Sequence, residues 1–249
     1  MTEPLDSLNS RDWSELQAAY GLATDVPEQL AALISEDAAR RAAAVEGLYG
    51  TVWHQGTVYE ATPLAVPYLS VVAREDGVDD RTRAQTALLL GCIASATSFV
   101  LPENPGQMHR AAWLRDASEQ APDRDLAEES RAAVVTQAPA LLAALAAAPT
   151  ATAAALLAPL AAVAPTMKGP VSTELHDLEQ DKDPLVAAAV RTVRQLSDGS
   201  LTEQDLAQLA AVDDETGEYL AAIADWPVNV RGVELVRELA ERLVSGRLG

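Results

Sequence analysis

The residues best suited to chemistry gather in one run, Tyr-Gly-Thr-Val-Trp-His-Gln-Gly-Thr-Val-Tyr-Glu-Ala-Thr, at positions 49–62. The run holds one of the three histidines of the chain, one of its four tryptophans and two of its five tyrosines. His54 and Glu60 are the residue types of a general acid–base pair, although neither a nucleophile motif nor a glycine-rich phosphate loop accompanies them. Trp53 and Tyr59 are types that often dominate binding surfaces. The run therefore favours recognition over catalysis.

Two interpretations of this run remain open. In the structural one, Gly56 supplies a turn with positive φ, while Trp53 and Tyr59 pack over helix ends. Glu60 and Thr62 would then cap the next helix. In the functional one, exposed aromatic and polar groups on a rigid connection form a recognition site. The candidate binding residues of the run are Trp53, His54, Gln55, Tyr59 and Glu60.

The remaining reactive residue types do not form a recognisable catalytic or metal-binding pattern. His54, His109 and His176 are far apart in sequence, without the paired histidine or cysteine spacings of metal sites. Cys92 is the single cysteine and lies in an apolar stretch, where a buried small residue is expected rather than a nucleophile. We therefore expect no catalytic residue, no metal and no cofactor, and predict that the protein is not an enzyme.

The overall charge limits the classes of partner. The chain of 249 residues carries 18 Lys and Arg against 37 Asp and Glu, which gives a formal net charge of −19. Binding to nucleic acid or to an anionic membrane requires clustered cations, so neither is expected. A basic protein partner fits better. The first residues also lack the basic and apolar regions of a signal peptide, so a cytoplasmic location is expected.

The composition and periodicity predict an all-α chain. Only 4% of the residues are aromatic and alanine is abundant, which favours close-packed helices over a β-sandwich or barrel. Positions 132–167 carry no charge, but four prolines interrupt them, so a pair of buried helices is favoured over a membrane hairpin. The first four helices should begin near Asp25, Asp37, Tyr59 and Arg81. Further helices are expected at about 108–118, 124–147 with an interruption near Pro139, 151–164, 171–181, 184–197, 202–211, 215–224 and 231–244.

The starts of the second helices repeat at a regular interval. Asp37, Asp80 and Asp123 are spaced by 43 residues, as are Pro184 and Pro227, and this spacing lies within the period of about 40–47 residues of HEAT and armadillo repeats. The openings Asp-Ala-Ala-Arg-Arg-Ala-Ala from Asp37, Asp-Arg-Thr-Arg-Ala from Asp80 and Asp-Pro-Leu-Val-Ala-Ala-Ala from Asp183 resemble the second helix of HEAT repeats. The segments Trp-His-Gln-Gly, Tyr-Glu-Ala-Thr and Ala-Val-Pro between positions 53 and 67 resemble a bacterial HEAT-repeat subgroup.

The resemblance implies an armadillo-like α-α superhelix, a right-handed solenoid of antiparallel helix pairs, spanning 1–249 as one domain. Residues 1–24 would form an N-terminal cap and residues 25–97 the best-defined repeats. Residues 98–170 would form an irregular or inserted repeat, and residues 171–249 the C-terminal repeats.

The resemblance also places several arginines on helices that line the concave face of such a solenoid. Arg40, Arg83 and Arg191 are the binding candidates among them. They either pair internally with neighbouring acids or form a groove for an acidic peptide. The acidic runs at 75–80, 177–183 and 213–218 either cap helices or steer a cationic partner.

Together these observations predict a non-catalytic, protein-binding HEAT-repeat scaffold. A narrower version is an immunity or antitoxin-like protein that covers a basic toxin. The alternative is a small enzyme or ligand-binding protein of the HEAT-like lyase type, with a pocket at the Trp53–Thr62 connection. The sequence predicts no oligomeric state.

Overall fold

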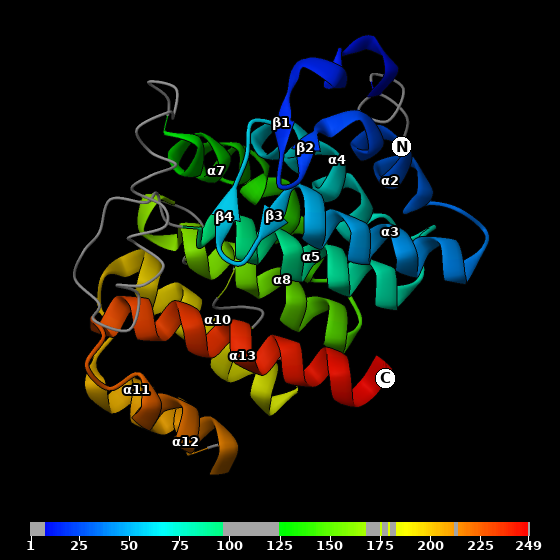
Figure 1. Cartoon of the computed structure of the whole chain (residues 1–249). Coiled ribbons are helices and arrows are strands. Elements are labelled where there is room, and N and C mark those ends of the chain that lie inside the picture. Colours follow the sequence, from blue (N-terminus) through cyan, green and yellow to red (C-terminus); the bar gives the residue numbers. More distant parts are fainter. Residues whose placement is uncertain are drawn as a thin grey trace.

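The computed structural model describes residues 8–96, 125–167, 175, 179, 183–211 and 214–248 (Figure 1). Over these residues the chain is mostly helical, which confirms the predicted all-α class. The helix expected at 108–118 lies outside the described residues, together with Asp123, His109 and His176. Nearly all of the helix expected at 171–181 also lies outside them.

The helices agree closely with the periodicity of the sequence. They are α2 (Val26–Ala32), α3 (Ala38–Thr51), α4 (Thr62–Arg74), α5 (Asp80–Ala94), α7 (Leu126–Leu145), α8 (Thr150–Val163), α10 (Pro184–Asp198), α11 (Glu203–Ala210), α12 (Asp214–Ala222) and α13 (Val228–Leu248). Short 3₁₀ helices, η1 (Leu8–Ser10), η2 (Trp13–Glu15), η3 (Ala23–Asp25) and η5 (Ala164–Thr166), complete the helical elements described.

Two short antiparallel hairpins interrupt the helices. In the first, β1 (Gln17–Ala18) pairs with β2 (Gly21–Leu22), and in the second, β3 (Trp53–His54) pairs with β4 (Thr57–Val58). Each strand has two residues, which is too short for an alternating pattern to reveal it in the sequence.

Aspartates cap several helices, as their sequence positions suggest. The Oδ1 of Asp37 accepts hydrogen bonds from the backbone N–H of Ala39 and Arg40 at the start of α3. Asp183 accepts from Leu185 N–H in the same way on α10. On α5 the cap is Asp79 instead of the expected Asp80, because the chain already has helical geometry at Asp80.

The expected interruption near Pro139 is wrong. Helix α7 runs without a break from Leu126 to Leu145, with Pro139 inside it. Proline removes one backbone donor from a helix, yet tertiary packing can hold the helix together across it. Here Ala138, Leu141 and Leu142 on either side of the proline are buried in the core, and their burial favours the continuous helix.

Successive helix pairs pack in the same order. In one row α2 contacts α4 and α4 contacts α7, while in the second row α3 contacts α5 and α5 contacts α8. Within the pairs, α2 contacts α3, α4 contacts α5, and α7 contacts α8. Figure 1 shows these helices lying roughly side by side. Most of the charge-free segment 132–167 thus lies in the pair α7–α8.

Helix α8 is the centre of the core. Every residue from Ala151 to Ala161 is buried, and the helix contacts α5, α7, α10 and α13. Small residues allow α5 and α8 to approach closely: a Cβ placed on Gly91 would lie 2.8 Å from the Cβ of Ala158. No described helix combines the length and the apolar character that a membrane span requires.

The last helix folds back over the stack. Helix α13, red in Figure 1, contacts α5, α8 and α10, and on its other side α11 and α12. It runs from Val228 to Leu248 and is therefore longer at both ends than the segment 231–244 expected from the sequence. This return brings the C-terminal part of the chain to the second hairpin.

Candidate functional site

The second hairpin turns through two residues with positive φ. Gln55 has φ 48° and Gly56 has φ 86°, which is the combination of a type I′ turn. Glycine adopts this conformation without strain, and the expected positive-φ role of Gly56 is confirmed. The tight turn directs Trp53 back toward the end of α3, where its ring meets Tyr49 edge to face, with centroids 5.8 Å apart and an interplanar angle of 90°.

The polar residues after the hairpin fix it to the rest of the chain. Thr62 Oγ1 donates to the carbonyl of Val52 and accepts from the backbone N–H of Tyr59 at 2.8 Å. Glu60 accepts from the backbone N–H of Gln17 at 2.9 Å, which connects it to the first hairpin. The expectation that Glu60 and Thr62 cap the next helix is therefore wrong: α4 begins after Ala61 without a side-chain cap.

His54 is engaged by the first hairpin. Its Nε2 lies 2.9 Å from the hydroxyl of Tyr20, and the two rings meet at 5.2 Å in a T-shaped contact. Tyr20 is 79% exposed at the tip of its hairpin. His54 and Glu60, the two residues with acid–base character, thus each contact the first hairpin.

A cavity of about 550 Å³ opens beside the second hairpin. It lies where α3, the hairpin, the end of α5 and helix α13 meet. Of the sequence-based candidates, Trp53 and Gln55 line it, whereas His54, Tyr59 and Glu60 do not. The lining residues are Tyr49, Trp53, Gln55, Gly56, Cys92, Ser95, Ala96, Glu234, Arg237 and Glu241.

Helix α13 supplies an ionic wall of this cavity. Arg237 donates to Glu234 through one terminal nitrogen at 2.6 Å, and to Glu241 through the other. Burial acts to lower the pKa of Arg237, but the two carboxylates outweigh it and hold the pKa above its ordinary value. Glu234 also accepts from the hydroxyl of Tyr219 at 3.2 Å. The wall therefore carries two negative charges and one positive charge.

The second hairpin, α3 and α5 supply an apolar wall. The rings of Tyr49 and Trp53 form its largest surface. The Tyr49 hydroxyl donates to the carbonyl of Gln85 at 3.4 Å. The indole Nε1 of Trp53 is buried and has no hydrogen-bond partner among the described residues. A buried donor without an acceptor is uncommon in folded proteins.

Cys92 also lines the cavity but is not activated. Burial is the main cause that raises the pKa of its thiol to about 12, so the thiol is protonated at neutral pH. Burial likewise raises the pKa of Tyr49 well above its ordinary value. Neither side chain is therefore ionised as a nucleophile at neutral pH.

The candidate arginines are all held in ion pairs and do not line the cavity. Arg40 lies 3.3 Å from Glu28, and Arg83 lies 3.3 Å from Asp76 and 3.6 Å from Asp80. The side chain of Arg83 is only 6% exposed. Arg191 pairs with Glu179 at 2.5 Å. These are the internal pairs that the first of the two sequence-based alternatives describes.

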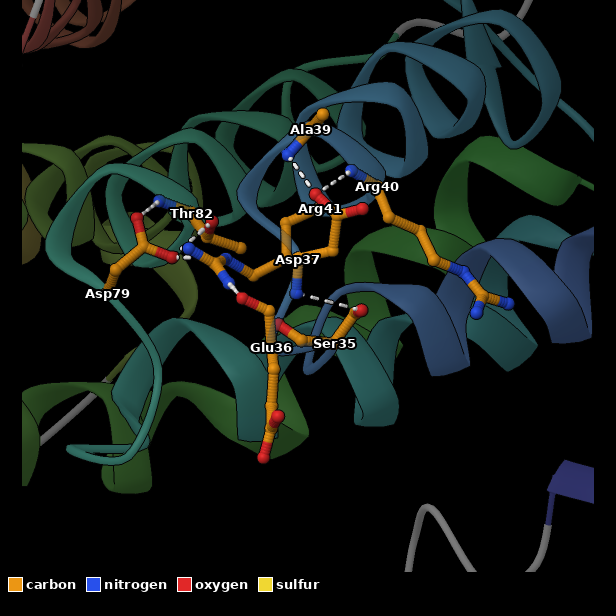
Figure 2. A network of polar contacts seen from close by, with 8 residues as sticks. All are labelled: Ser35, Glu36, Asp37, Ala39, Arg40, Arg41, Asp79 and Thr82. Atoms are coloured by element: carbon orange, nitrogen blue, oxygen red, sulfur yellow. Dashed lines mark hydrogen bonds and ion pairs between the residues drawn. The ribbon is translucent and has the colours of Figure 1, made fainter.

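Arg41 shows what the repeated acid–arginine pattern does structurally. Figure 2 shows its guanidinium in the turns that precede α3 and α5. It donates to the carbonyls of Ser35 and Glu36, at 2.7 and 3.0 Å, and lies 2.6 Å from a carboxylate oxygen of Asp79. Arg41 thus connects the start of α3, the second helix of its pair, with the start of α5, the second helix of the next pair.

Sequence reasoning missed the ionic wall of the cavity. Glu234, Arg237 and Glu241 are spaced three and four residues apart, which is also the spacing of ordinary ion pairs on a solvated helix. For the cavity as a whole, the only sequence signal was the aromatic run that begins at Tyr49. Among the described residues, no group of three or more His, Cys, Asp or Glu side chains is arranged to hold a metal ion.

Comparisons with protein-family models, with curated proteins and with solved structures find no match for this chain.

Proposed function

We propose that this protein is a non-catalytic scaffold of the HEAT type that binds a basic protein partner. The observation that carries the proposal is the cavity between the second hairpin and α13, which combines aromatic rings with an excess of carboxylate charge. Such a surface can bind through shape and charge without a reactive group.

The order of helix packing supports the solenoid part of the proposal. The pairs α2–α3, α4–α5 and α7–α8 follow one another, and each helix contacts the next helix in its own row. A repeat protein is built in this way, with each unit burying its apolar face against its neighbour. Arg41 and Asp79 connect two successive units at equivalent turns, which also fits a repeated architecture.

The state of the reactive residues supports a non-catalytic role. His54 and Glu60 hold contacts with the first hairpin and do not line the cavity. Cys92 lines it, but its thiol is protonated at neutral pH. A general base must reach the proton that it removes, and a cysteine nucleophile must be ionised.

The charge of the chain supports a basic partner. A formal net charge of −19 creates a negative potential over the molecule, and such a potential accelerates association with cations. Because salt screens exposed charges over about 10 Å at 0.1 M, the affinity should fall as salt rises.

The test is recovery of a complex with its natural partner. The tagged protein is purified from its source cell, the co-purifying protein is identified by mass spectrometry, and the complex is reconstituted from purified components. We expect a partner with a basic binding surface and a dissociation constant that rises at least tenfold between 50 and 300 mM NaCl. Reconstitution with an acidic partner, or an affinity independent of salt, would contradict the proposal. If the partner stops growth when it is expressed alone, and co-expression of this protein restores growth, the narrower, antitoxin-like version is supported.

A further inference from the structure

We propose that the cavity beside the second hairpin receives one lysine or arginine side chain of an extended segment of the partner. This inference rests on the proposed function and specifies its contact site. It follows from two features of the cavity, its charge and its aromatic surface.

The charge of the cavity favours a cation over an anion. Glu234 and Glu241 outnumber Arg237, so the wall is left with one net negative charge. Both terminal nitrogens of Arg237 already donate to these carboxylates. An incoming anion would have to displace one of these carboxylates from Arg237. An incoming cation would instead join the two carboxylates that are already in place.

Glu241 is the carboxylate best placed to accept the cation. Its side chain is 39% exposed, against 17% for Glu234, which also accepts from Tyr219. An ionised carboxylate can accept about four hydrogen bonds through its two oxygens. Glu241 therefore retains acceptor capacity while it holds Arg237 in position.

The aromatic wall suits the carbon chain and the charge of a basic side chain. The edge-to-face arrangement of Tyr49 and Trp53 offers apolar surface to the methylene groups of lysine or arginine. The face of an indole or phenol ring also attracts an ammonium or guanidinium group within about 6 Å of the ring centre. The cavity volume of about 550 Å³ lies within the usual range of about 300–1,000 Å³ for small-ligand sites.

The experiment observes the Trp53 indole directly. The indole N–H resonances of the full-length, ¹⁵N-labelled protein are recorded, and Trp53→Phe identifies the Trp53 signal. The protein is titrated with acetyl-Ala-Ala-Lys-Ala-Ala-amide and with the same peptide carrying uncharged norleucine in place of lysine. We expect the lysine peptide to shift the Trp53 signal with saturation, and the norleucine peptide to bind at least fivefold more weakly.

Variants distinguish this site from general charge attraction. Glu241→Gln should weaken lysine-peptide binding at least fivefold, because it removes the accessible carboxylate of the cavity. Glu218→Gln removes the same charge from an exposed position on α12 and should change binding less than twofold. Thermal unfolding followed by circular dichroism checks that both variants are folded.

The outcomes separate this inference from the proposed function. Equal binding of the two peptides, no shift of the Trp53 signal, or equal losses in the two variants would overturn the cavity assignment. If the natural basic partner still binds Glu241→Gln as tightly as the original protein, the scaffold proposal stands and the cavity assignment fails. If the natural partner is acidic, the scaffold proposal fails even where the lysine peptide binds.

Discussion

The ring of Tyr49 meets the ring of Trp53 at a right angle, with 5.8 Å between their centroids. Tyr49 lies in the last turn of α3, and Trp53 begins the strand β3 that follows it. The contact therefore fixes the angle at which the second hairpin leaves the helix. It also forms the aromatic wall of a cavity whose ionic wall comes from the other end of the chain.

The Tyr49–Trp53 contact should be measurable as a coupling energy. Aromatic pairs in this geometry contribute about 0.5–1.5 kcal/mol beyond the burial of their area. A double-mutant cycle with Tyr49→Ala and Trp53→Ala, followed by urea unfolding, should give a coupling in this range. The pair Trp13→Ala and Trp53→Ala, with no ring contact between its members, is the control and should be additive within about 0.5 kcal/mol. Additivity of the Tyr49 and Trp53 changes would show that the contact contributes nothing.

The close approach of α5 and α8 predicts that Gly91→Ala lowers the free energy of unfolding. Alanine is the better helix former by about 1 kcal/mol, but its Cβ would lie 2.8 Å from the Cβ of Ala158 and 3.3 Å from backbone atoms of α8. Overpacking of this kind costs about 1–3 kcal/mol, so the net effect should be destabilising.

Gly50→Ala is the matched control, because a Cβ at this helical position meets no atom within 4 Å. It should raise the free energy of unfolding by about 0.5–1 kcal/mol. Urea unfolding of both variants measures the difference. Stabilisation by Gly91→Ala would show that α5 and α8 are farther apart than described.

The elements of the fold could be predicted from the sequence because local signals define them. Alanine-rich periodic runs indicate the helices, and Asp37 and Asp183 mark helix starts that the structure confirms. Pro139 was misleading because the packing of neighbouring leucines outweighs its local effect on α7.

The cavity could be predicted only in part. Trp53 and Gln55 belong to a run of unusual residues, so the sequence identified this wall as a candidate. Glu234 and Arg237 contribute the other wall because α13 returns to contact α5 and α8. No local pattern specifies where a distant helix packs, and the i, i+3 spacing of this pair is equally typical of an exposed helix surface.

Acid should weaken the joint between α3 and α5. Burial acts to raise the pKa of Asp79, but hydrogen bonds from Thr82 and the charge of Arg41 outweigh it and hold the pKa below its ordinary value. Because the pKa is lower in the folded state, the ionised carboxylate stabilises the fold above the unfolded pKa of about 4. This stabilisation disappears as the pH falls through the lower, folded pKa.

Asp79→Asn tests this joint, because asparagine remains a good N-cap but cannot pair with Arg41. At pH 7 the variant should have a free energy of unfolding lower by about 0.5–1 kcal/mol. The deficit should shrink below pH 4, as the original protein loses the same interaction. Asp37→Asn, a cap for which no ion pair is described, should show a smaller deficit at pH 7. Urea unfolding at pH 7, 4 and 3 measures both, and a deficit independent of pH would contradict the assigned role of Asp79.

The state of Cys92 predicts slow alkylation. With the pKa of the thiol raised to about 12 mainly by burial, its ionised fraction at pH 8 is roughly two-thousandfold below that of a thiol with a pKa of about 8.5. Iodoacetamide should therefore modify the folded protein at least 100-fold more slowly than the protein unfolded in urea. Since Cys92 is the single cysteine, intact-protein mass spectrometry reports its modification alone. The rate for the folded protein should still rise between pH 9 and 10.5, because the thiol continues to ionise over this range; a plateau below pH 9 would identify an activated thiol and reopen a catalytic role for the cavity.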